Sequence, residues 1–174
     1  MSNGMAPHER KKMKRFICLL LLTAALLGCV ACNTNPSDGA PKYVFNVGSI
    51  TVKINDEAEA VIGALGEALD YSESPSCAFE GLDKVYIYAG FRIQTYPLNG
   101  KDYVYSIELT DDSVKTPEGI AIGSSADAVL KAYGEAGKQT DTSILYSDDV
   151  GGVTLQFILR DGQVKNIQYL RNED

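Results

Sequence analysis

The chain has 174 residues, of which 45% are hydrophobic and 22% charged, which excludes a disordered, collagen-like or coiled-coil protein. Its length allows one domain or two very small ones. The formal net charge of −7 at pH 7 argues against a nucleic-acid partner, because such proteins neutralise phosphates with an excess of basic residues.

Residues 1–28 have the pattern of a secretory signal peptide. A mostly basic segment, 10–15, precedes a short apolar run, 16–28. The run is shorter than the roughly 20 residues that a membrane-spanning helix needs. We therefore predict that 1–28 is a cleaved signal peptide.

The apolar run ends in Leu26-Leu27-Gly28-Cys29, which resembles a bacterial lipobox. The resemblance implies that Cys29 is acylated and that the chain is cut before it. Cys32 is the alternative acylation site, and secretion without acylation is the alternative outcome. Because two acyl chains anchor a protein stably, we expect a palmitate-bearing lipoprotein on the extracytoplasmic face of a bacterial cell membrane. Residues 29–42 combine proline, glycine and polar residues, which predicts a flexible tether.

The rest of the chain contains an internal repeat. The segment 58–68 shares seven of eleven residues with 126–136, at a constant offset. In both segments apolar residues recur at helical spacing, and Gly66 and Gly134 are placed to end the helices. The repeated segments therefore predict two short helices.

Capping side chains precede both predicted helices. Asn55 or Asp56 is expected to cap the first helix. Ser124, with Asp127 three residues later, resembles a capping box for the second.

Alternating apolar and polar residues follow each predicted helix and indicate antiparallel strands. Asn99-Gly100 and Asp161-Gly162 are strong hairpin signals. The predicted fold of 43–174 is a single α+β domain of two tandem units, about 43–111 and 112–174, each a short helix packed on an antiparallel β-meander. The predicted strands are 84–89, 91–96 and 103–109 in the first meander, 143–146, 153–160 and 164–170 in the second, and 52–54 and 120–122 before the helices.

This two-unit pattern resembles the tandem-repeat fold of β-lactamase inhibitory protein. Segment 74–84 resembles small lipoproteins of gut-dwelling Gram-positive bacteria. These resemblances imply a tandem-repeat envelope lipoprotein and imply no catalytic activity. The chain also resembles the SmpA/OmlA lipoprotein family through a sequence motif formed by Gly123, Ser125, Val129, Tyr133 and Gly134.

The chain beyond the signal peptide lacks the usual catalytic side chains. The single histidine, His8, lies in the signal peptide, and Cys77 is the one cysteine of 43–174. This excludes Ser-His-Asp and Cys-His nucleophiles and the usual zinc sites. We expect no enzyme activity, no cofactor and no metal site, with Cys77 as a buried free thiol.

Acidic side chains also fall short of a recognisable site. Asp111-Asp112 and Asp148-Asp149 lack the ligand spacing of a calcium loop, so we expect solvated loop charges. Glu67 and Glu135 occupy equivalent repeat positions at helix ends. We expect solvated side chains there and not a glycosidase-like carboxylate pair.

The first meander offers a candidate binding surface. Period-two alternation places Val85 and Ile87 toward the helices. Phe91 and Ile93 share this parity, provided that no bulge interrupts the strands near Gly90. The opposite face would carry tyrosine and arginine, which are enriched at protein-binding hot spots; the alternative is that tyrosine simply favours half-exposed strand positions. The predicted partner-binding face consists of Tyr86, Tyr88, Arg92, Gln94 and Tyr96.

The sequence therefore predicts a non-catalytic, membrane-anchored lipoprotein that binds another protein. The expected partners are the lipid bilayer, through acylated Cys29, and a protein, with no nucleic acid. The alternatives are an envelope assembly or structural factor and a small-ligand-binding lipoprotein. A solute-binding protein of a transporter fits less well, because those are usually two-lobed α/β chains well above this length.

Overall fold

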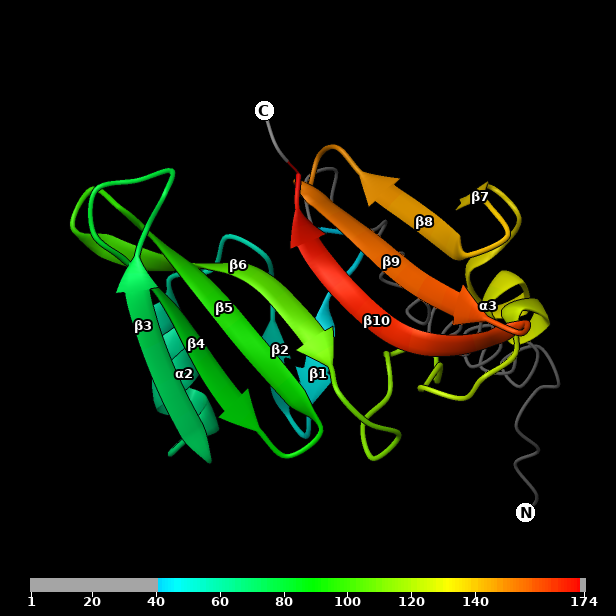
Figure 1. Cartoon of the computed structure of the whole chain (residues 1–174), viewed down its shortest axis with the longest axis horizontal. Coiled ribbons are helices and arrows are strands. Elements are labelled where there is room, and N and C mark those ends of the chain that lie inside the picture. Colours follow the sequence, from blue (N-terminus) through cyan, green and yellow to red (C-terminus); the bar gives the residue numbers. More distant parts are fainter. Residues whose placement is uncertain (1–40, 173–174) are drawn as a thin grey trace, which may run out of the picture. The chain divides into compact units, whose positions relative to one another are not determined.

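The computed structural model describes residues 41–172 (Figure 1). The predicted signal peptide over 1–28, nearly all of the tether over 29–42, and both candidate acylation sites, Cys29 and Cys32, lie outside the described residues. The positions that carry the predicted repeats and the predicted binding face lie within them.

Eight strands of the described chain form one antiparallel sheet. Two short strands, β1 (Phe45–Val47) and β2 (Ile50–Val52), form a separate ribbon. The sheet strands are β3 (Asp70–Pro75), β4 (Leu82–Tyr88), β5 (Phe91–Leu98), β6 (Lys101–Leu109), β7 (Lys138–Gln139), β8 (Ser143–Asp148), β9 (Val153–Arg160) and β10 (Gln163–Arg171). Their order across the sheet is β3-β4-β5-β6-β10-β9-β8-β7.

The predicted fold of two tandem units, each a helix on its own meander, is wrong. The described chain is mostly β, and all strands beyond the ribbon belong to one continuous sheet. The sheet is continuous because β6 pairs with β10, from Leu109 opposite Ile167 to Ser106 opposite Leu170. Without this pairing, β6 and β10 would each be an edge strand with unpaired backbone N–H and C=O groups.

Two edge strands also escaped prediction. The residues of β3 are exposed along its whole length, so the strand carries no alternating apolar pattern. β7 has two residues, both exposed. The predicted strand at 52–54 is replaced by the ribbon strand β2, and 120–122 forms no strand.

Both helices lie where the repeated segments predict them. α2 spans Ala58–Leu65 and α3 spans Ala126–Tyr133. Gly66 and Gly134 end them as predicted, with positive φ angles of 80° and 84° that glycine adopts without steric cost. The two glycine N–H groups donate to helix carbonyls, at 3.0 Å to Ile62 and 2.8 Å to Leu130.

The predicted helix caps are wrong by one or two positions. Glu57 is the N-cap of α2, and its side chain makes no capping hydrogen bond. Ser125, not Ser124, caps α3, and its hydroxyl oxygen accepts from the Ala128 N–H at 3.2 Å. Ser124 instead accepts from the Ala121 N–H at 3.1 Å, within the turn that precedes the helix.

The segment before each helix pairs with the last strand of a meander. The Asn55 N–H donates to the Val104 carbonyl of β6 at 2.9 Å. The Gly123 N–H donates to the Val164 carbonyl of β10 at 2.8 Å. This pairing ties the start of each helix to the sheet.

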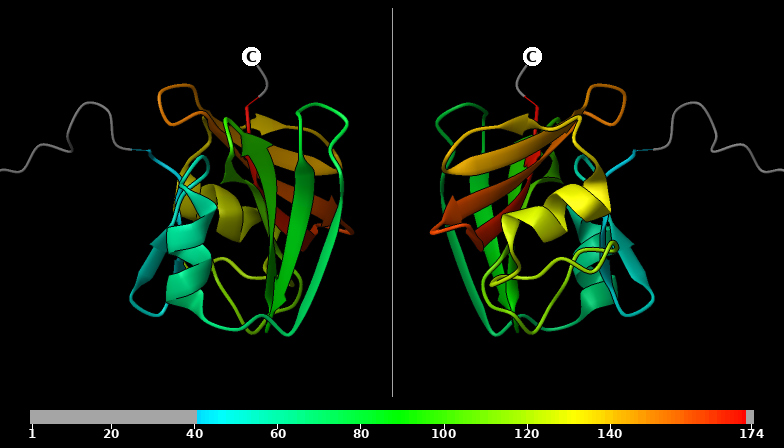
Figure 2. Two further views of the ribbon diagram at one scale, coloured as in Figure 1. Left: turned by 90° about the vertical axis from the view of Figure 1, so that its left-hand side faces the viewer. Right: turned by 90° about the vertical axis from the view of Figure 1, so that its right-hand side faces the viewer.

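The hydrophobic core fills the space between the sheet and the layer of helices and ribbon, which lie on one side of the sheet (Figure 2). Phe45 of the ribbon packs edge-on against Phe91 of β5, with ring centroids 5.1 Å apart. The largest fully buried side chains are Tyr169, Phe45, Phe157, Ile93, Ile107, Leu109, Ile144, Leu155, Ile167, Val52, Val104 and Val129. Among the described residues, the opposite side of the sheet has no covering layer of helices.

Candidate functional site

The candidate site lies on the sheet face opposite the helices, which we call the uncovered face. Cross-strand pairing identifies its members, because partners across an antiparallel sheet project from the same side. The central part of the uncovered face consists of Val85, Ile87, Arg92, Gln94, Glu108, Ser106, Asn166, Gln168, Leu170, Thr154, Gln156 and Ile158. Most of these side chains are half-buried, and Arg92 and Ile158 are exposed.

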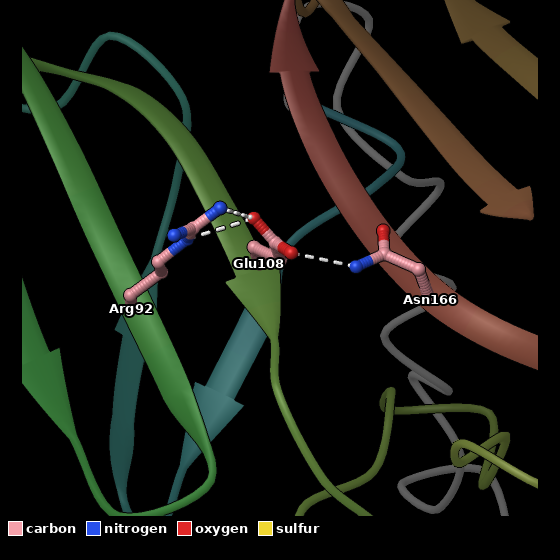
Figure 3. Close-up of polar contacts among 3 residues, drawn as sticks. All are labelled: Arg92, Glu108 and Asn166. Atoms are coloured by element: carbon pink, nitrogen blue, oxygen red, sulfur yellow. Dashed lines mark hydrogen bonds and ion pairs between the residues drawn. The ribbon is translucent and has the colours of Figure 1, made fainter.

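A polar network crosses the seam between β6 and β10 on this face (Figure 3). The Nε of Arg92 donates to Oε2 of Glu108 at 2.8 Å, and an Nη2 hydrogen bond joins the same two side chains. The Nδ2 of Asn166 donates to Oε1 of Glu108 at 2.6 Å. Both carboxylate oxygens of Glu108 are therefore occupied, and the three side chains hold one another in a fixed arrangement.

One atom of the network lacks a partner. Asn166 Oδ1 is buried and accepts no hydrogen bond from any described residue. Asn166 follows an irregularity of register in β10 at Lys165, which turns successive side chains away from strict alternation. An unsatisfied buried acceptor is costly, so Asn166 is a position where an additional N–H or O–H donor would be favourable.

An aromatic cluster lies at the other end of the uncovered face, around Tyr96. Its ring lies 5.1 Å from that of Phe79 and 6.1 Å from that of Tyr105, measured between centroids. The guanidinium of Arg171 lies 5.2 Å from the Tyr96 centroid, and the Tyr96 hydroxyl donates to Asn55 Oδ1 at 3.1 Å. Tyr96 is 6% exposed, so its role is to hold this cluster together.

The predicted partner-binding face is divided by the structure. Tyr86 and Tyr88 project toward the helices, and Arg92 and Gln94 project from the uncovered face. Tyr96 is on the uncovered face but buried beneath Phe79. Arg92 and Gln94 are thus the accessible members of the predicted set on that face.

The two-residue turn at Ala89-Gly90 causes this division. It places Tyr88 directly opposite Phe91, so both rings point to the helix side and stack 5.0 Å apart. The prediction assumed that side chains alternate between the two faces without interruption across the turn, and this turn makes that assumption wrong. Val85 and Ile87, expected to face the helices, pair with Gln94 and Arg92 and lie on the uncovered face.

The second meander follows its predicted alternation. Val153, Leu155 and Phe157 are fully buried, and the intervening residues of β9 are half-buried or exposed. Ile158, an apolar residue among polar ones, is 37% exposed on the uncovered face.

Sequence reasoning missed Glu108 and Asn166. They are 58 residues apart in the chain, and the β6–β10 pairing that brings them together leaves no local sequence signal. β6 is the last strand of the first meander, and β10 is the last strand of the second. Their equivalent positions are the one signal that could have suggested their pairing.

The remaining predicted positions have ordinary structural roles. Cys77, predicted to be buried, is exposed. Glu67 and Glu135 are exposed as predicted. Among the described residues, no group of histidine, cysteine, aspartate and glutamate side chains has the arrangement of a metal site.

Asp111, Asp112 and Asp149 are exposed, as expected of solvated loop charges, whereas Asp148 is half-buried. One aspartate of each pair also accepts hydrogen bonds within its loop. Asp111 accepts hydrogen bonds from the Ser113 side chain and N–H, which lower the pKa of its carboxyl. Partial burial of Asp148 would raise the pKa of its carboxyl, but backbone N–H donors, including that of Lys42 at 2.6 Å, outweigh it and the pKa is lowered. Both aspartates therefore fix loop conformations.

Tyr133, the half-buried last residue of α3, and the buried Tyr169 of β10 lie on the helix side. Burial, more than the nearby carboxylate of Glu118, raises the pKa of the Tyr133 and Tyr169 hydroxyls. The Tyr133 hydroxyl donates to Glu118. Tyr169 is 1% exposed, and its hydroxyl has no hydrogen-bond partner among the described residues. This polar group is enclosed in the core and does not open onto a surface where a substrate could bind.

Comparison of the chain with family models, curated proteins and solved structures found no match. Among the described residues, no helix has both the length and the apolar character needed to cross a membrane.

Proposed function

We propose that this protein is a membrane-anchored lipoprotein whose folded domain binds another protein through the uncovered face and catalyses no reaction. The observation that carries the proposal is the network of Arg92, Glu108 and Asn166, which is ordered before any partner arrives. Side chains held in place in the free protein lose little conformational freedom on binding, so more of the interaction energy appears as affinity.

The composition of the uncovered face supports the same function. Apolar side chains, Val85, Ile87 and Leu170, surround the polar network and are half-buried. A mixture of apolar surface and fixed polar groups, with arginine at its centre, is typical of protein interfaces.

The absence of catalytic activity is proposed from the sequence. No histidine lies beyond the signal peptide, and Glu108, a carboxylate of the uncovered face, already accepts hydrogen bonds on both oxygens. Such a paired carboxylate serves recognition better than proton transfer.

The membrane anchor is proposed from the lipobox resemblance at Cys29. Its test is metabolic labelling of the full chain with an alkyne analogue of palmitate. We expect label on the parent and on Cys32→Ala, and none on Cys29→Ala. Label that survives Cys29→Ala and disappears in Cys32→Ala would move the anchor to Cys32, and an unlabelled parent would contradict acylation.

The binding function is tested by purifying the tethered protein from the native envelope, with its partner retained by crosslinking. We expect one protein to be captured by the parent and by Lys131→Ser, a control on an exposed helix position, and to be lost from Arg92→Ser. Serine at Tyr88 or Tyr96 would test folding and not binding, because both rings are buried. Equal capture by all variants, or by none, would contradict this surface.

The composition of a captured complex separates the proposal from its nearest alternative. A transient partner that dissociates on dilution is expected of a binding module. A stable complex of fixed stoichiometry in the membrane would instead favour an envelope assembly factor.

A further inference from the structure

A hollow lies on the helix side of the sheet, apart from the uncovered face. It has a volume of about 380 Å³ and lies between α2, the strand β4 and the β5–β6 hairpin. Aliphatic surface comes from Ala58 and Ile62 of α2, and an aromatic side chain, Tyr86, comes from β4. The charged lining residues are Glu57, Glu59, Lys84, Lys101 and Asp102.

The two lysines of the hollow are already neutralised. Lys84 Nζ lies 2.6 Å from Asp102 Oδ2, and Lys101 Nζ lies 2.8 Å from Glu57 Oε2. Glu59 has no salt-bridge partner among the described residues. The lining therefore retains one negative charge in excess.

Aromatic rings and a further carboxylate extend one wall of the hollow. Tyr71 of the edge strand β3 is 45% exposed, and its ring lies 5.0 Å from that of Tyr86, measured between centroids. The Tyr71 hydroxyl donates to Glu73 Oε2 at 2.5 Å. This hydrogen bond is the main reason why the pKa of Tyr71 is raised to about 12, so the phenol stays neutral and its donor keeps the Glu73 carboxylate beside the rings.

We propose that this hollow binds a lysine or arginine side chain from an extended basic peptide segment of a partner protein. The aliphatic stem of such a side chain packs on Ile62 and the Tyr86 ring, as long cationic side chains do on apolar surfaces. Its charged head lies near the rings of Tyr71 and Tyr86 and the carboxylates of Glu59 and Glu73, where cation–π attraction and charge complementarity act together.

This binding site does not depend on the proposed function of the uncovered face. The hollow is lined by side chains on the helix side, whereas Arg92 and Glu108 project from the opposite face. A peptide could bind the hollow whether or not a protein binds the other face.

The test is fluorescence anisotropy with a labelled peptide of alternating lysine and alanine, and with a matched peptide in which glutamine replaces lysine. We expect the described domain, within the full chain, to bind the lysine peptide and not the glutamine peptide. Glu59 and Tyr71 are exposed, so we expect Glu59→Gln and Tyr71→Ser to fold like the parent. Each substitution is expected to weaken peptide binding by about threefold to tenfold.

Matched controls locate the effect. Glu135→Gln removes an exposed carboxylate beyond α3 and is expected to leave peptide affinity unchanged, as is Arg92→Ser on the uncovered face. Equal binding of the two peptides, or unchanged affinity in both Glu59→Gln and Tyr71→Ser, would overturn the proposal. Displacement of the peptide by spermine at equivalent cation concentration would show a general cation site and contradict peptide recognition, and a loss of peptide affinity in Arg92→Ser would place the site on the other face.

Discussion

The two faces of the eight-stranded sheet are built by the same strands and differ in burial and polarity. On the helix side, Phe157, Ile167 and Leu155 are fully buried against the helices and ribbon. On the uncovered face, Gln94 and Gln156 are half-buried and Arg92 is exposed. One face therefore stabilises the fold, and the other is available for recognition at little cost in stability.

The strongest contrast is expected between adjacent residues of β9. Phe157→Ala removes a fully buried aromatic side chain and is expected to lower the free energy of unfolding by about 3–5 kcal/mol. Gln156→Ala, one position earlier on the uncovered face, is expected to change it by less than about 0.5 kcal/mol. Urea denaturation of both variants measures the difference. Similar losses in the two variants would mean that the faces are not distinct.

A second pair tests the change of parity at the Ala89-Gly90 turn. Tyr88 is 8% exposed and stacks on Phe91, so Tyr88→Ala is expected to cost about 2–4 kcal/mol of unfolding free energy. Gln94→Ala is expected to cost less than about 0.5 kcal/mol. Thermal or urea unfolding distinguishes the two. If Tyr88→Ala left the free energy of unfolding nearly unchanged, Tyr88 would lie on the uncovered face, as the sequence suggested.

Substitutions in the polar network test the binding role proposed for the uncovered face. The Arg92 and Glu108 side chains are 50% and 17% exposed, and such partly solvated ion pairs contribute at most about 1 kcal/mol to folding. Arg92→Ala and Glu108→Gln should therefore leave the domain folded while weakening partner binding. A double-mutant cycle of the two substitutions measures their coupling in urea denaturation. A coupling well above that value would assign the pair to fold stability.

The smallest expected difference is in how stability changes at alkaline pH. Burial raises the pKa of Tyr133 and Tyr169, so ionisation disfavours the folded state. Their contribution is fully present below the unfolded tyrosine pKa of about 10 and is lost as pH rises toward the folded values. The urea midpoint should fall above about pH 10, less steeply in Tyr169→Phe, and as steeply as in the parent in Gln156→Ala. An identical slope in Tyr169→Phe would contradict the burial of this hydroxyl as the cause.

Local sequence signals predicted the local structure well. The repeated segments located α2 and α3, the glycines at 66 and 134 marked where the helices end, and hairpin residues marked the turns at Asn99-Gly100 and Asp161-Gly162. These features depend on residues close together in the chain.

What the sequence could not show depends on pairing between distant strands. The β6–β10 seam joins residues 58 or more positions apart, and it turns two expected units into one sheet. A register shift between Gln94 and Thr95 and the turn at Ala89-Gly90 each change which side a residue faces. For this reason Tyr86 and Tyr88 were assigned to the wrong face, while Arg92 and Gln94 were assigned correctly to the one opposite the helices.

The most direct test of the uncovered face is site-specific photocrosslinking in intact cells of the native host. A photoreactive residue would replace Gln94, Gln156 or Gln168 on the uncovered face, or Lys131 or Ala132 at exposed positions of α3. We predict that the three uncovered-face positions crosslink to one and the same protein and that the helix positions do not. Crosslinks from the helix positions alone, or none from any uncovered-face position, would contradict this face as the binding surface.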